Sequence, residues 1–582
     1  MGGVTDFLLE LRSEEIPARM QDKAREDLAR LFVAELERAG LKPGAAVTYA
    51  TPRRLALILR DLPDATDAVE EEVKGPRTSA PPQALDGFLR KTGLTQDQLE
   101  DRDGVWFAVT SRPGRATADV LAEAVPAVIR GFPWPKSMRW GDASVSTESP
   151  RWVRPLQGIV ALFGGAVVPC EAAGVVSGAT TMGHRFHHPD AVTIASADSY
   201  VEALRAAYVL VDQEERRAII RDGAANLAAD AGLVLIEDAP LVAENAGLTE
   251  WPVPLLGRFD EAFLAVPPEV IQLTARVNQK YFVCSQADGT LANAFVCTAN
   301  IAAADGGAKI VEGNRKVLAA RLSDAKFFYD TDLKTRLEGL TPKLEKIVFH
   351  EKLGTVADKV ERVAKLARWL VEEGIVPQKP LPPTLSPEEE GERARLADQA
   401  ERAARLAKAD LVTGMVGEFP ELQGLMGGYY AAAQGEDPAV AAAIRDHYKP
   451  VGQGDDVPTA PVTVAVSLAD KLDTLSAFFG VNLLPTGSKD PFALRRAALG
   501  ILGIILSNSL RMKLVETLRY SSMWLRYGGH DLEGFDTRVR DFFADRLKVQ
   551  QREAGVRHDL IDAVFALGGE DDLVRLLARV HA

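Results

Sequence analysis

The sequence has few cysteines and no long hydrophobic run. Only three cysteines occur among its 582 residues, at Cys170, Cys284 and Cys297. They are too few for a disulfide framework and too widely spaced for a CxxC metal knuckle, so a reducing cytoplasm is the expected compartment. No run approaches the roughly 18 to 20 apolar residues that a membrane span needs. The first residues also lack the basic and apolar stretches of a signal peptide.

Motifs for nucleotide binding are missing as well. The sequence contains neither a GxxxxGK[ST] phosphate loop nor a GxGxxG turn after an expected strand. A chain of this length without a nucleotide site is expected to work with a partner that has one.

Basic residues are fewer than acidic ones: the sequence has 68 Lys and Arg and 82 Asp and Glu, which gives a net charge of −14. This balance excludes a histone-like protein that coats nucleic acid. It leaves a local basic groove open, because salt screens charges beyond about 8–10 Å and binding depends on the local potential.

The length predicts several domains. We expect a multidomain α+β protein, in which residues 1–340 form a mixed α/β region with more than one subdomain. Helical periodicity dominates after Lys343. Changes in composition near 340 and 490 then predict a mainly helical domain at 341–490 and a helical body and tail at 491–582.

The expected elements follow from hydrophobic periodicity and turn residues. Residues 7–11 and 55–59 are expected strands, with a helix between them from Ser13 to about Gly40 that has an acidic first turn. The prolines in 378–387 predict an exposed connector. Further strands are expected at 158–168, 192–194, 281–284 and 294–297, and helices at 356–372, 389–416, 439–448 and 462–479.

Several short runs place arginine or lysine beside turn-forming or aromatic residues. A rigid turn can present these cations to phosphate oxygens, and a nearby ring can stack on an unpaired base. Each run alone also fits a solvated face or an internal salt bridge. The runs are 51–54, 74–77, 136–140, 183–188, 278–282, 313–316 and 488–496.

Three histidines stand close together at His184, His187 and His188. No nearby cysteine or tightly spaced carboxylate completes a metal site. We therefore expect a loop of stacked or hydrogen-bonded histidines.

The helical region contains His350, Asp410, Asp470 and Asp473. A histidine and aspartates on successive helices hold the metal of HD-type phosphohydrolases. That chemistry needs a histidine directly before the central aspartate, where this chain has Ala409. Because losing one imidazole costs metal affinity, we expect an HD-like domain with a degenerate site at His350, Asp410 and Asp470 and no metal.

The runs together resemble the β subunit of heterotetrameric bacterial glycyl-tRNA synthetase. Residues 7–17 read FLLELRSEEIP where the family reads LLLEIGTEELP, and DPFALRRAA at 490–498 is the most distinctive match. The resemblance is collinear along the chain. Its other segments are 51–56, 136–140, 183–186, 279–282, 313–315, 320–325, 349–355, 408–413 and 418–424.

The resemblance implies a cytoplasmic subunit that binds and positions tRNA(Gly) for a catalytic α subunit in an α₂β₂ tetramer. The α subunit would use ATP and Mg²⁺ to activate glycine, and this chain would hold no cofactor and no catalytic residue. The family ends with a helical anticodon-binding domain, which would begin about where this chain ends, so that domain is expected to be absent or truncated. The candidate RNA contacts are Arg53, Arg54, Lys136, Arg139, Arg185, Lys280, Arg315, Arg495 and Arg496.

Three alternatives remain at this point. The HD-like region could make the chain a metal-dependent phosphohydrolase, which Ala409 disfavours. The acidic balance would suit a protein scaffold that never contacts RNA. The N-terminal region could resemble the editing domains of other synthetases, although no motif assigns such hydrolysis to it.

Overall fold

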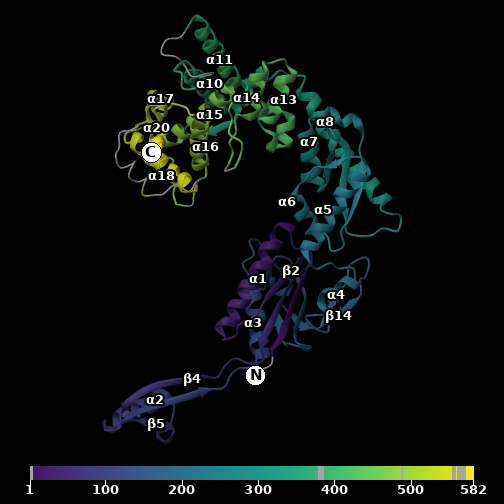
Figure 1. Ribbon diagram of the computed structural model, residues 1–582, viewed down its shortest axis with the longest axis vertical. Coiled ribbons are helices and arrows are strands. Elements are labelled where there is room, and N and C mark those ends of the chain that lie inside the picture. The colour runs from purple at the N-terminus through teal and green to yellow at the C-terminus, as the bar shows by residue number, and fades with distance from the viewer. Residues whose placement is uncertain are drawn as a thin grey trace. The chain divides into compact units, whose positions relative to one another are not determined.

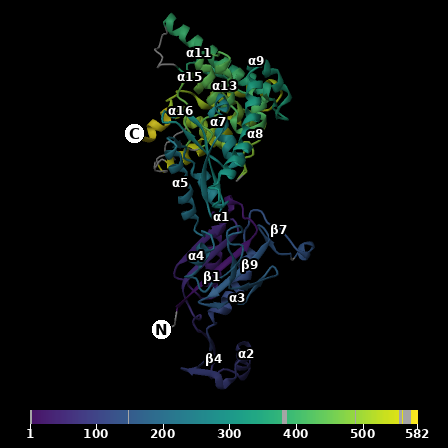
Figure 2. The same ribbon diagram turned by 90° about the vertical axis from the view of Figure 1, so that its right-hand side faces the viewer.

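The computed structural model describes residues 4–147, 149–377, 386–452, 454–487, 489–553, 559 and 572–581. They form two compact units, a mixed α/β unit and a helical unit (Figures 1 and 2). The first unit comprises Met1–Leu264 and Ile271–Arg321, and the second comprises Ala265–Val270 and Leu322–Ala582. The units divide inside helix α8 (Ala308–Asp332). The multidomain mixed α/β class is thus confirmed, while the three domains at 1–340, 341–490 and 491–582 stay a prediction.

A seven-stranded sheet forms the centre of the first unit. Its main strand order is β11-β12-β9-β1-β3-β2, with β10 paired to β9. Paired strands are antiparallel except β12 and β9, which are parallel. The strands are β1 (Val4–Ser13), β2 (Ala46–Thr51), β3 (Arg54–Pro63), β9 (Leu156–Phe163), β10 (Ala166–Val167), β11 (Glu171–Ala172) and β12 (Val175–Gly178).

The alternating side chains of β1 contribute to a core on each face of this sheet. Phe7, Leu9 and Leu11 pack with α1 (Ala18–Arg38) and α3 (Thr117–Gly131) on one face. Leu8 packs on the other face with α4 (Tyr200–Ala206). Glu10 has the parity of Leu8 and is buried. A carboxylate therefore lies inside the second core, where it needs partners.

Two smaller sheets complete the first unit. Between β3 and α3, the sheet β4-β6-β5 and α2 surround a small core of Phe88, Leu99 and Ala108. A four-stranded sheet, β15-β17-β18-β16, packs against α5 and α6. The bounds are β4 (Val69–Arg77), α2 (Pro82–Thr92), β5 (Leu99–Arg102), β6 (Val105–Arg112), α5 (Gln213–Asp230), β15 (Val234–Leu235), α6 (Ala239–Ala246), β16 (Val253–Arg258), β17 (Phe282–Ser285) and β18 (Leu291–Ala299).

Two short strand pairs carry candidate residues in the same unit. The pair β7 (Met138–Arg139) and β8 (Arg151–Trp152) follows α3. The pair β13 (Thr180–Met182) and β14 (Ala191–Thr193) flanks the three histidines.

Helix α15 (Pro461–Gly480) is the centre of the second unit. Nearly all of its residues are buried, including the polar Ser467, Asp470, Lys471 and Asp473. A helix buried on all sides is the interior element of a helical domain. Its neighbours are α10 (Val356–Glu372), α11 (Pro387–Leu406), α14 (Pro438–Asp446), α16 (Leu494–Ser507), α17 (Leu514–Tyr527) and α18 (Phe535–Glu553). The remaining elements are α9 (Leu337–Leu340), β19 (Val348–His350), β20 (Gly354–Thr355), α12 (Gly414–Glu418), α13 (Leu425–Ala433) and α20 (Leu573–His581).

Most of the predicted helices are present. The helix predicted at 356–372 is α10, and those predicted at 439–448 and 462–479 are α14 and α15 within two residues. The helix predicted at 389–416 is interrupted instead. The chain leaves α11 at Leu406, forms a 3₁₀ turn at Ala409–Val412, and starts α12 after Thr413, whose hydroxyl accepts the N–H of Val416.

Two predicted boundaries were wrong. The helix predicted from Ser13 starts at Ala18, because β1 continues its pairing to Ser13 and Pro17 occupies the N-cap. The acidic pair before Pro17 therefore precedes the helix and does not form its first turn. Residues 378–385 of the predicted connector lie outside the described residues, but its last residue, Pro387, is the first residue of α11. Proline is favoured at that position because the first helical N–H has no partner in the helix.

The described ranges contain no helix with the length and apolarity that a membrane crossing requires. The three cysteines are unpaired.

Candidate functional site

The turn between β2 and β3 holds two candidate arginines, and Arg54 is buried. Its side chain is 1% exposed. The guanidinium donates to Glu250 Oε1 at 2.5 Å and to the Met182 carbonyl at 2.5 Å, and its Nε lies 3.5 Å from Glu10 Oε2. This burial corrects the sequence-based candidate list, because a guanidinium enclosed by two carboxylates does not reach a phosphate.

The two carboxylates of this pair have further donors. Tyr200 Oη donates to Glu10 Oε2 at 2.6 Å, and Thr51 Oγ1 donates to Glu250 Oε1 at 2.7 Å. Burial by itself raises the pKa of Glu250, but the Arg54 charge and the Thr51 hydrogen bond bring that pKa below its usual value. The buried group is therefore an ion pair, and it fastens β1 and β3 to the chain that follows α6.

A second buried guanidinium lies behind the same turn. Arg216 donates to the carbonyls of Ala50 at 2.6 Å, Leu210 at 2.5 Å and Ala246 at 3.0 Å. Burial lowers the pKa of Arg216 to about 10. Because these acceptors are neutral, Arg216 adds positive charge beneath the turn and fixes its backbone.

Arg12, Arg53 and Arg185 form a partly exposed basic cluster next to this pair. Burial, and then the charge of Arg53, lowers the pKa of Arg12. Burial also lowers the pKa of Arg53, and the charges of Arg54 and Arg185 lower it further against the opposing effect of Glu250. Arg12 lies opposite Arg54 in the register of β1 and β3, and Arg54 is the chain neighbour of Arg53, so Arg12 and Arg53 carry like charge at the same end of these strands.

Little negative charge neutralises the basic cluster directly. Arg12 donates to the amide oxygen of Gln157 at 2.8 Å, which is neutral. Arg185 pairs with Glu15 at 3.3 Å, and both side chains are exposed, so the pair is weak. Within the described ranges, neither Arg12 nor Arg53 makes a salt bridge. Burial lowers the pKa of Arg53, and the charges of Glu250 and Glu14 oppose this without a salt bridge to it, so the cluster is only partly neutralised.

The histidine loop is hydrogen-bonded and stacked, as predicted. His184 Nδ1 accepts the N–H groups of Phe186 at 3.2 Å and His187 at 3.1 Å. His187 Nε2 accepts the Ala302 N–H at 3.0 Å, and its ring stacks on Tyr208 at 4.7 Å. These two nitrogens are engaged as acceptors, and the absence of a metal from this loop stays a prediction.

The other candidates of the first unit lie on other elements than the three arginines of the basic cluster. Lys136 is exposed and has no partner among the described residues, while Arg139 donates to the Ser146 carbonyl at 3.0 Å. The remaining two are neutralised by carboxylates, Lys280 by Glu244 at 2.9 Å and Arg315 by Glu312 at 2.8 Å.

In the second unit, Arg495 and Arg496 lie at the start of α16. Asp490 caps this helix by accepting the N–H of Leu494 and that of Arg495, each at 2.9 Å. The Arg495 guanidinium donates to the Gly487 carbonyl at 2.6 Å. Arg496 is exposed and lines a hollow of about 310 Å³ with Asp455 and other residues. This run therefore caps a helix and leaves one arginine at the surface.

Comparison with known proteins gives the family. The model of the glycyl-tRNA synthetase beta subunit family matches residues 7–566. The chain belongs to this family. It is 52% identical over 577 residues to the glycine–tRNA ligase beta subunit of Phenylobacterium zucineum, covering 99% of this chain and 80% of that protein. The beta subunits of Paracoccus denitrificans and Rhodospirillum centenum are each 48% identical, with 81% and 82% of their lengths covered.

This membership makes the chain a component of an aminoacyl-tRNA synthetase, a ligase, and the HD-like candidates can be judged against it. His350 accepts the Lys352 N–H at 3.2 Å, and its ring packs on Phe478. Asp410 is fully buried, and its Oδ2 accepts the N–H groups of Gly424 at 2.6 Å and Gly427 at 3.0 Å. Each candidate has its own partners, and the described residues contain no group of three His, Cys, Asp or Glu able to hold a metal.

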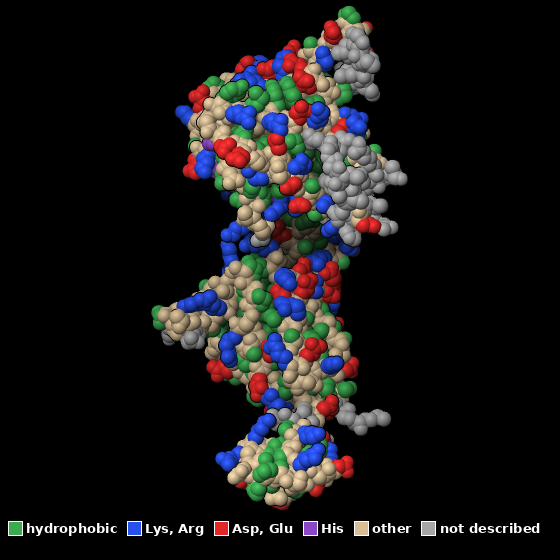
Figure 3. Space-filling model, turned by 90° about the vertical axis from the view of Figure 1, so that its left-hand side faces the viewer, with side chains coloured by type: hydrophobic (Ala, Val, Ile, Leu, Met, Phe, Trp, Pro, Cys, Tyr) green, Lys and Arg blue, Asp and Glu red, His purple; other side chains and the backbone are tan. Residues whose placement is uncertain are grey.

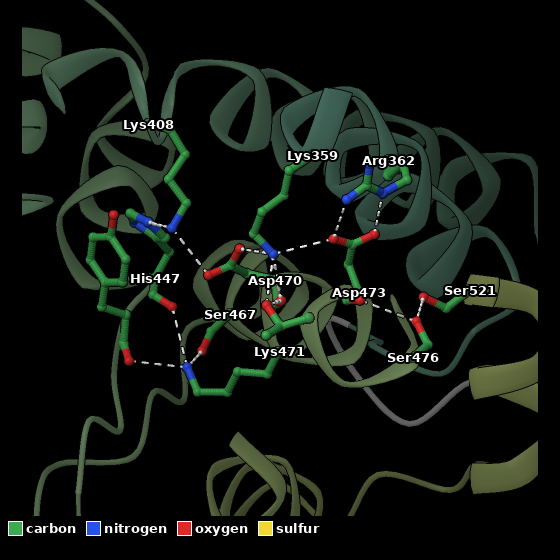
Figure 4. Close-up of polar contacts among 12 residues, drawn as sticks. Lys359, Arg362, Lys408, His447, Ser467, Asp470, Lys471, Asp473, Ser476 and Ser521 are labelled. Atoms are coloured by element: carbon green, nitrogen blue, oxygen red, sulfur yellow. Dashed lines mark hydrogen bonds and ion pairs between the residues drawn. The ribbon is translucent and has the colours of Figure 1, made fainter. Parts of the chain in front are cut away.

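Lysines surround the third HD-like candidate, Asp470 (Figure 4). Its carboxylate lies 3.0 Å from Lys359 Nζ and 3.1 Å from Lys408 Nζ. Lys359 and Arg362 also pair with Asp473 at 3.2 and 2.7 Å. Ammonium groups on both oxygens of Asp470 repel a divalent cation, so these residues do not fit a metal. The phosphohydrolase alternative gains no support, and the HD-like arrangement itself stays a prediction.

The sequence interpretation missed Arg12 and Glu250. Arg12 points to the same face of the sheet as Glu10, and in the register of β1 and β3 it lies opposite Arg54. A hairpin pairing argument could have placed it beside the turn. Glu250 lies 196 residues from Arg54 in the chain, and no motif around it indicated a contact with the turn.

We predict that Arg54→Met destabilises the protein strongly, because it leaves Glu10 and Glu250 buried without their cation. The free energy of unfolding should fall by on the order of 3–5 kcal/mol. Urea unfolding followed by circular dichroism measures it. The control Arg221→Met removes an exposed arginine paired with its neighbour Asp222 and should change little. Equal unfolding midpoints for both variants would show that the buried pair is dispensable.

We predict that Asp410→Asn is stabilising at pH 7. Burial raises the pKa of Asp410 to about 6, despite hydrogen bonds from Gly424 and Gly427. A raised carboxyl pKa adds stability that is present below pH 4 and lost as pH rises through 6. The amide stays neutral and keeps an oxygen for both N–H groups, so unfolding at pH 7 should cost on the order of 1–2 kcal/mol more.

Thermal unfolding between pH 4 and 7 tests this, and the variant should show a flatter dependence on pH. The contrasting change Asp473→Asn weakens the pairs to Lys359 and Arg362 and should destabilise the protein. A drop in melting temperature for Asp410→Asn at pH 7 would contradict the role assigned to burial.

Proposed function

We propose that the chain holds tRNA(Gly) so that the α subunit of the same synthetase can attach glycine to it. The reaction is glycine + ATP + tRNA giving glycyl-tRNA + AMP + diphosphate. The α subunit supplies the site for ATP and Mg²⁺, and this chain holds no cofactor and forms no bond itself. The pair works in the cytoplasm as an α₂β₂ tetramer. The relatives of the chain, which are glycine–tRNA ligase beta subunits, support this assignment.

The observation that carries the proposal is the basic cluster formed by Arg12 on β1, Arg53 on a rigid turn and Arg185 in the histidine loop. The Arg53 carbonyl accepts the Ser13 N–H at 2.8 Å, and the Pro52 carbonyl accepts the Ile16 N–H at 2.6 Å. The backbone that carries Arg53 is thus fixed before any ligand arrives. A preformed cationic site loses little conformational entropy when it binds a phosphate.

The other cations would contribute unequally. Lys136 and Arg496 are exposed and could contact phosphates as they stand. Lys280 and Arg315 would have to exchange a carboxylate for a phosphate. Arg139 and Arg495 donate to carbonyl groups, so they support their loops first. Orientation by such contacts lowers the entropic cost of presenting the acceptor end to the α subunit.

We predict that Arg53→Ala weakens tRNA(Gly) binding about 5- to 10-fold and reduces the slope of log K against log salt by about one, because one phosphate contact is lost. Filter binding at several salt concentrations, with the α subunit present, measures both. Arg221→Ala, which removes an arginine paired with Asp222, is the control and should match the wild type.

Glycine charging by the α subunit with and without this chain tests the proposal as a whole. Charging that needs both chains, and that falls with Arg53→Ala, is the expected result. A protein scaffold would instead leave tRNA affinity weak and nearly independent of salt. If the α subunit charges equally well alone, the proposed function is wrong.

A further inference from the structure

A hollow of about 500 Å³ lies between α1 and the segment Phe132–Pro135 of the first unit. We call it the α1 groove. Met20 and Ala24 of α1 are buried and form its floor, and Phe132 and Trp134 form one wall with two prolines. Its volume is in the range of roughly 300–1,000 Å³ that is usual for ligand pockets.

The aromatic wall of the α1 groove is held in place from behind. The Trp134 ring lies 4.7 Å from Phe132 and 5.0 Å from Trp152, measured between centroids. Trp152 is fully buried, whereas Trp134 and Phe132 are partly exposed. The groove therefore presents aromatic surface that packing has already oriented.

The rim of the α1 groove is cationic. Arg19, Lys23 and Arg30 follow one another along the same face of α1, and their only acidic neighbour in the lining is Asp27. Asp27 is buried and accepts hydrogen bonds from Lys23 at 2.9 Å and Arg30 at 2.8 Å. Burial alone would raise its pKa, but those bonds bring it below the usual value, so Asp27 is ionised.

Three cations against one anion leave the rim positive. Arg19 is exposed and forms no ion pair in the part of the chain that the structure describes. Lys136, also exposed, directly follows the aromatic wall. The side of the first unit that carries α1 and α3 in Figure 1 faces the viewer in Figure 3, where both basic and acidic side chains lie among hydrophobic ones.

We propose that the α1 groove binds one unpaired nucleotide of the tRNA. The base packs against Trp134 and Met20, and a flanking phosphate is bound by Arg19 together with Lys23 or Arg30. This rests on the proposed function and adds a place for a single base to it. Aromatic rings accept the face of any base, while cations at the edge of the site bind the backbone.

The chemistry of the lining favours a nucleotide over a protein segment. A peptide brings backbone N–H and C=O groups that need partners when they are buried. Among the floor and wall residues, Trp134 carries the one side-chain hydrogen-bond donor, its buried indole N–H, and Met20, Ala24, Phe132, Pro133 and Pro135 carry none. A base can bury its apolar face here and keep its polar edge toward water, and its negative backbone matches the rim.

The test measures binding of tRNA(Gly) to the complex of this chain with its α subunit. Arg19→Glu and Trp134→Leu are each expected to weaken binding about 5- to 50-fold. Arg19→Glu should also reduce the salt slope, whereas Trp134→Leu should leave it unchanged, because stacking releases no counterions. The matched control is Arg221→Glu on α5, outside the groove, and it should bind like the wild type.

Trp134→Phe provides a second measurement, because it keeps a ring in the wall and should restore most of the affinity that Trp134→Leu loses. Melting temperatures show whether the Trp134 variants fold. If they do not fold, the tRNA affinity of Arg19→Glu, a change at an exposed position, tests the proposal by itself.

Wild-type affinity in both Arg19→Glu and a folded Trp134→Leu would overturn the α1 groove proposal. If Arg53→Ala still weakens binding in that case, the proposed function stands. Loss of association with the α subunit in size-exclusion chromatography, with tRNA affinity unchanged, would make the groove a protein site and also overturn the proposal. If the wild-type complex neither binds nor charges tRNA(Gly), the proposed function fails together with this inference.

Discussion

The buried pair of Arg54 with Glu250 is the constraint on which the first unit depends. Neither charge is stable alone in an apolar core, so each fixes the position of the other. Because Arg54 begins β3 and Glu250 follows α6, their contact joins the central sheet to the neighbouring part of the unit. It also turns Arg54 inward, and the adjacent Arg53 remains at the surface beside Arg12. The exposed cations are thus ordered by a pair that does not itself contact the ligand.

The second unit uses buried charge in the same manner. Asp470 and Asp473 of α15 bind Lys359 and Arg362 of α10, and Lys408 follows α11. In an HD-type hydrolase, carboxylates at such positions would gather around a metal. Here lysine and arginine side chains lie against the carboxylates and neutralise them. The arrangement joins three parts of the helical unit, α10, α15 and the segment after α11.

Local patterns predicted much of the fold and less of the site. The periodicity of α10 and α15 and the alternation of β1 are properties of short segments, so the sequence contained them. Arg53 and Arg54 are neighbours with the same chemistry, and only a glutamate 196 residues away separates their roles. The predicted start of α1 was wrong for a similar reason, because the pairing of β1 with β9 determines where the helix can begin. Contacts across long stretches of chain are the part that a single sequence does not reveal.

A net charge of −14 limits how such a chain can bind RNA. Long-range attraction is weak for an acidic protein, so the contacts that count must act within the screening length of about 8–10 Å. Cations on flexible side chains would then compete with the many nearby carboxylates, as the pairs of Lys280 and Arg315 show. Cations held apart from carboxylates by the fold avoid that competition. Arg12, Arg53 and Arg19 meet this condition, because none of them forms a salt bridge within the described ranges. Lys23 and Arg30 share a single buried aspartate, which orders them and leaves the rim with an excess of positive charge.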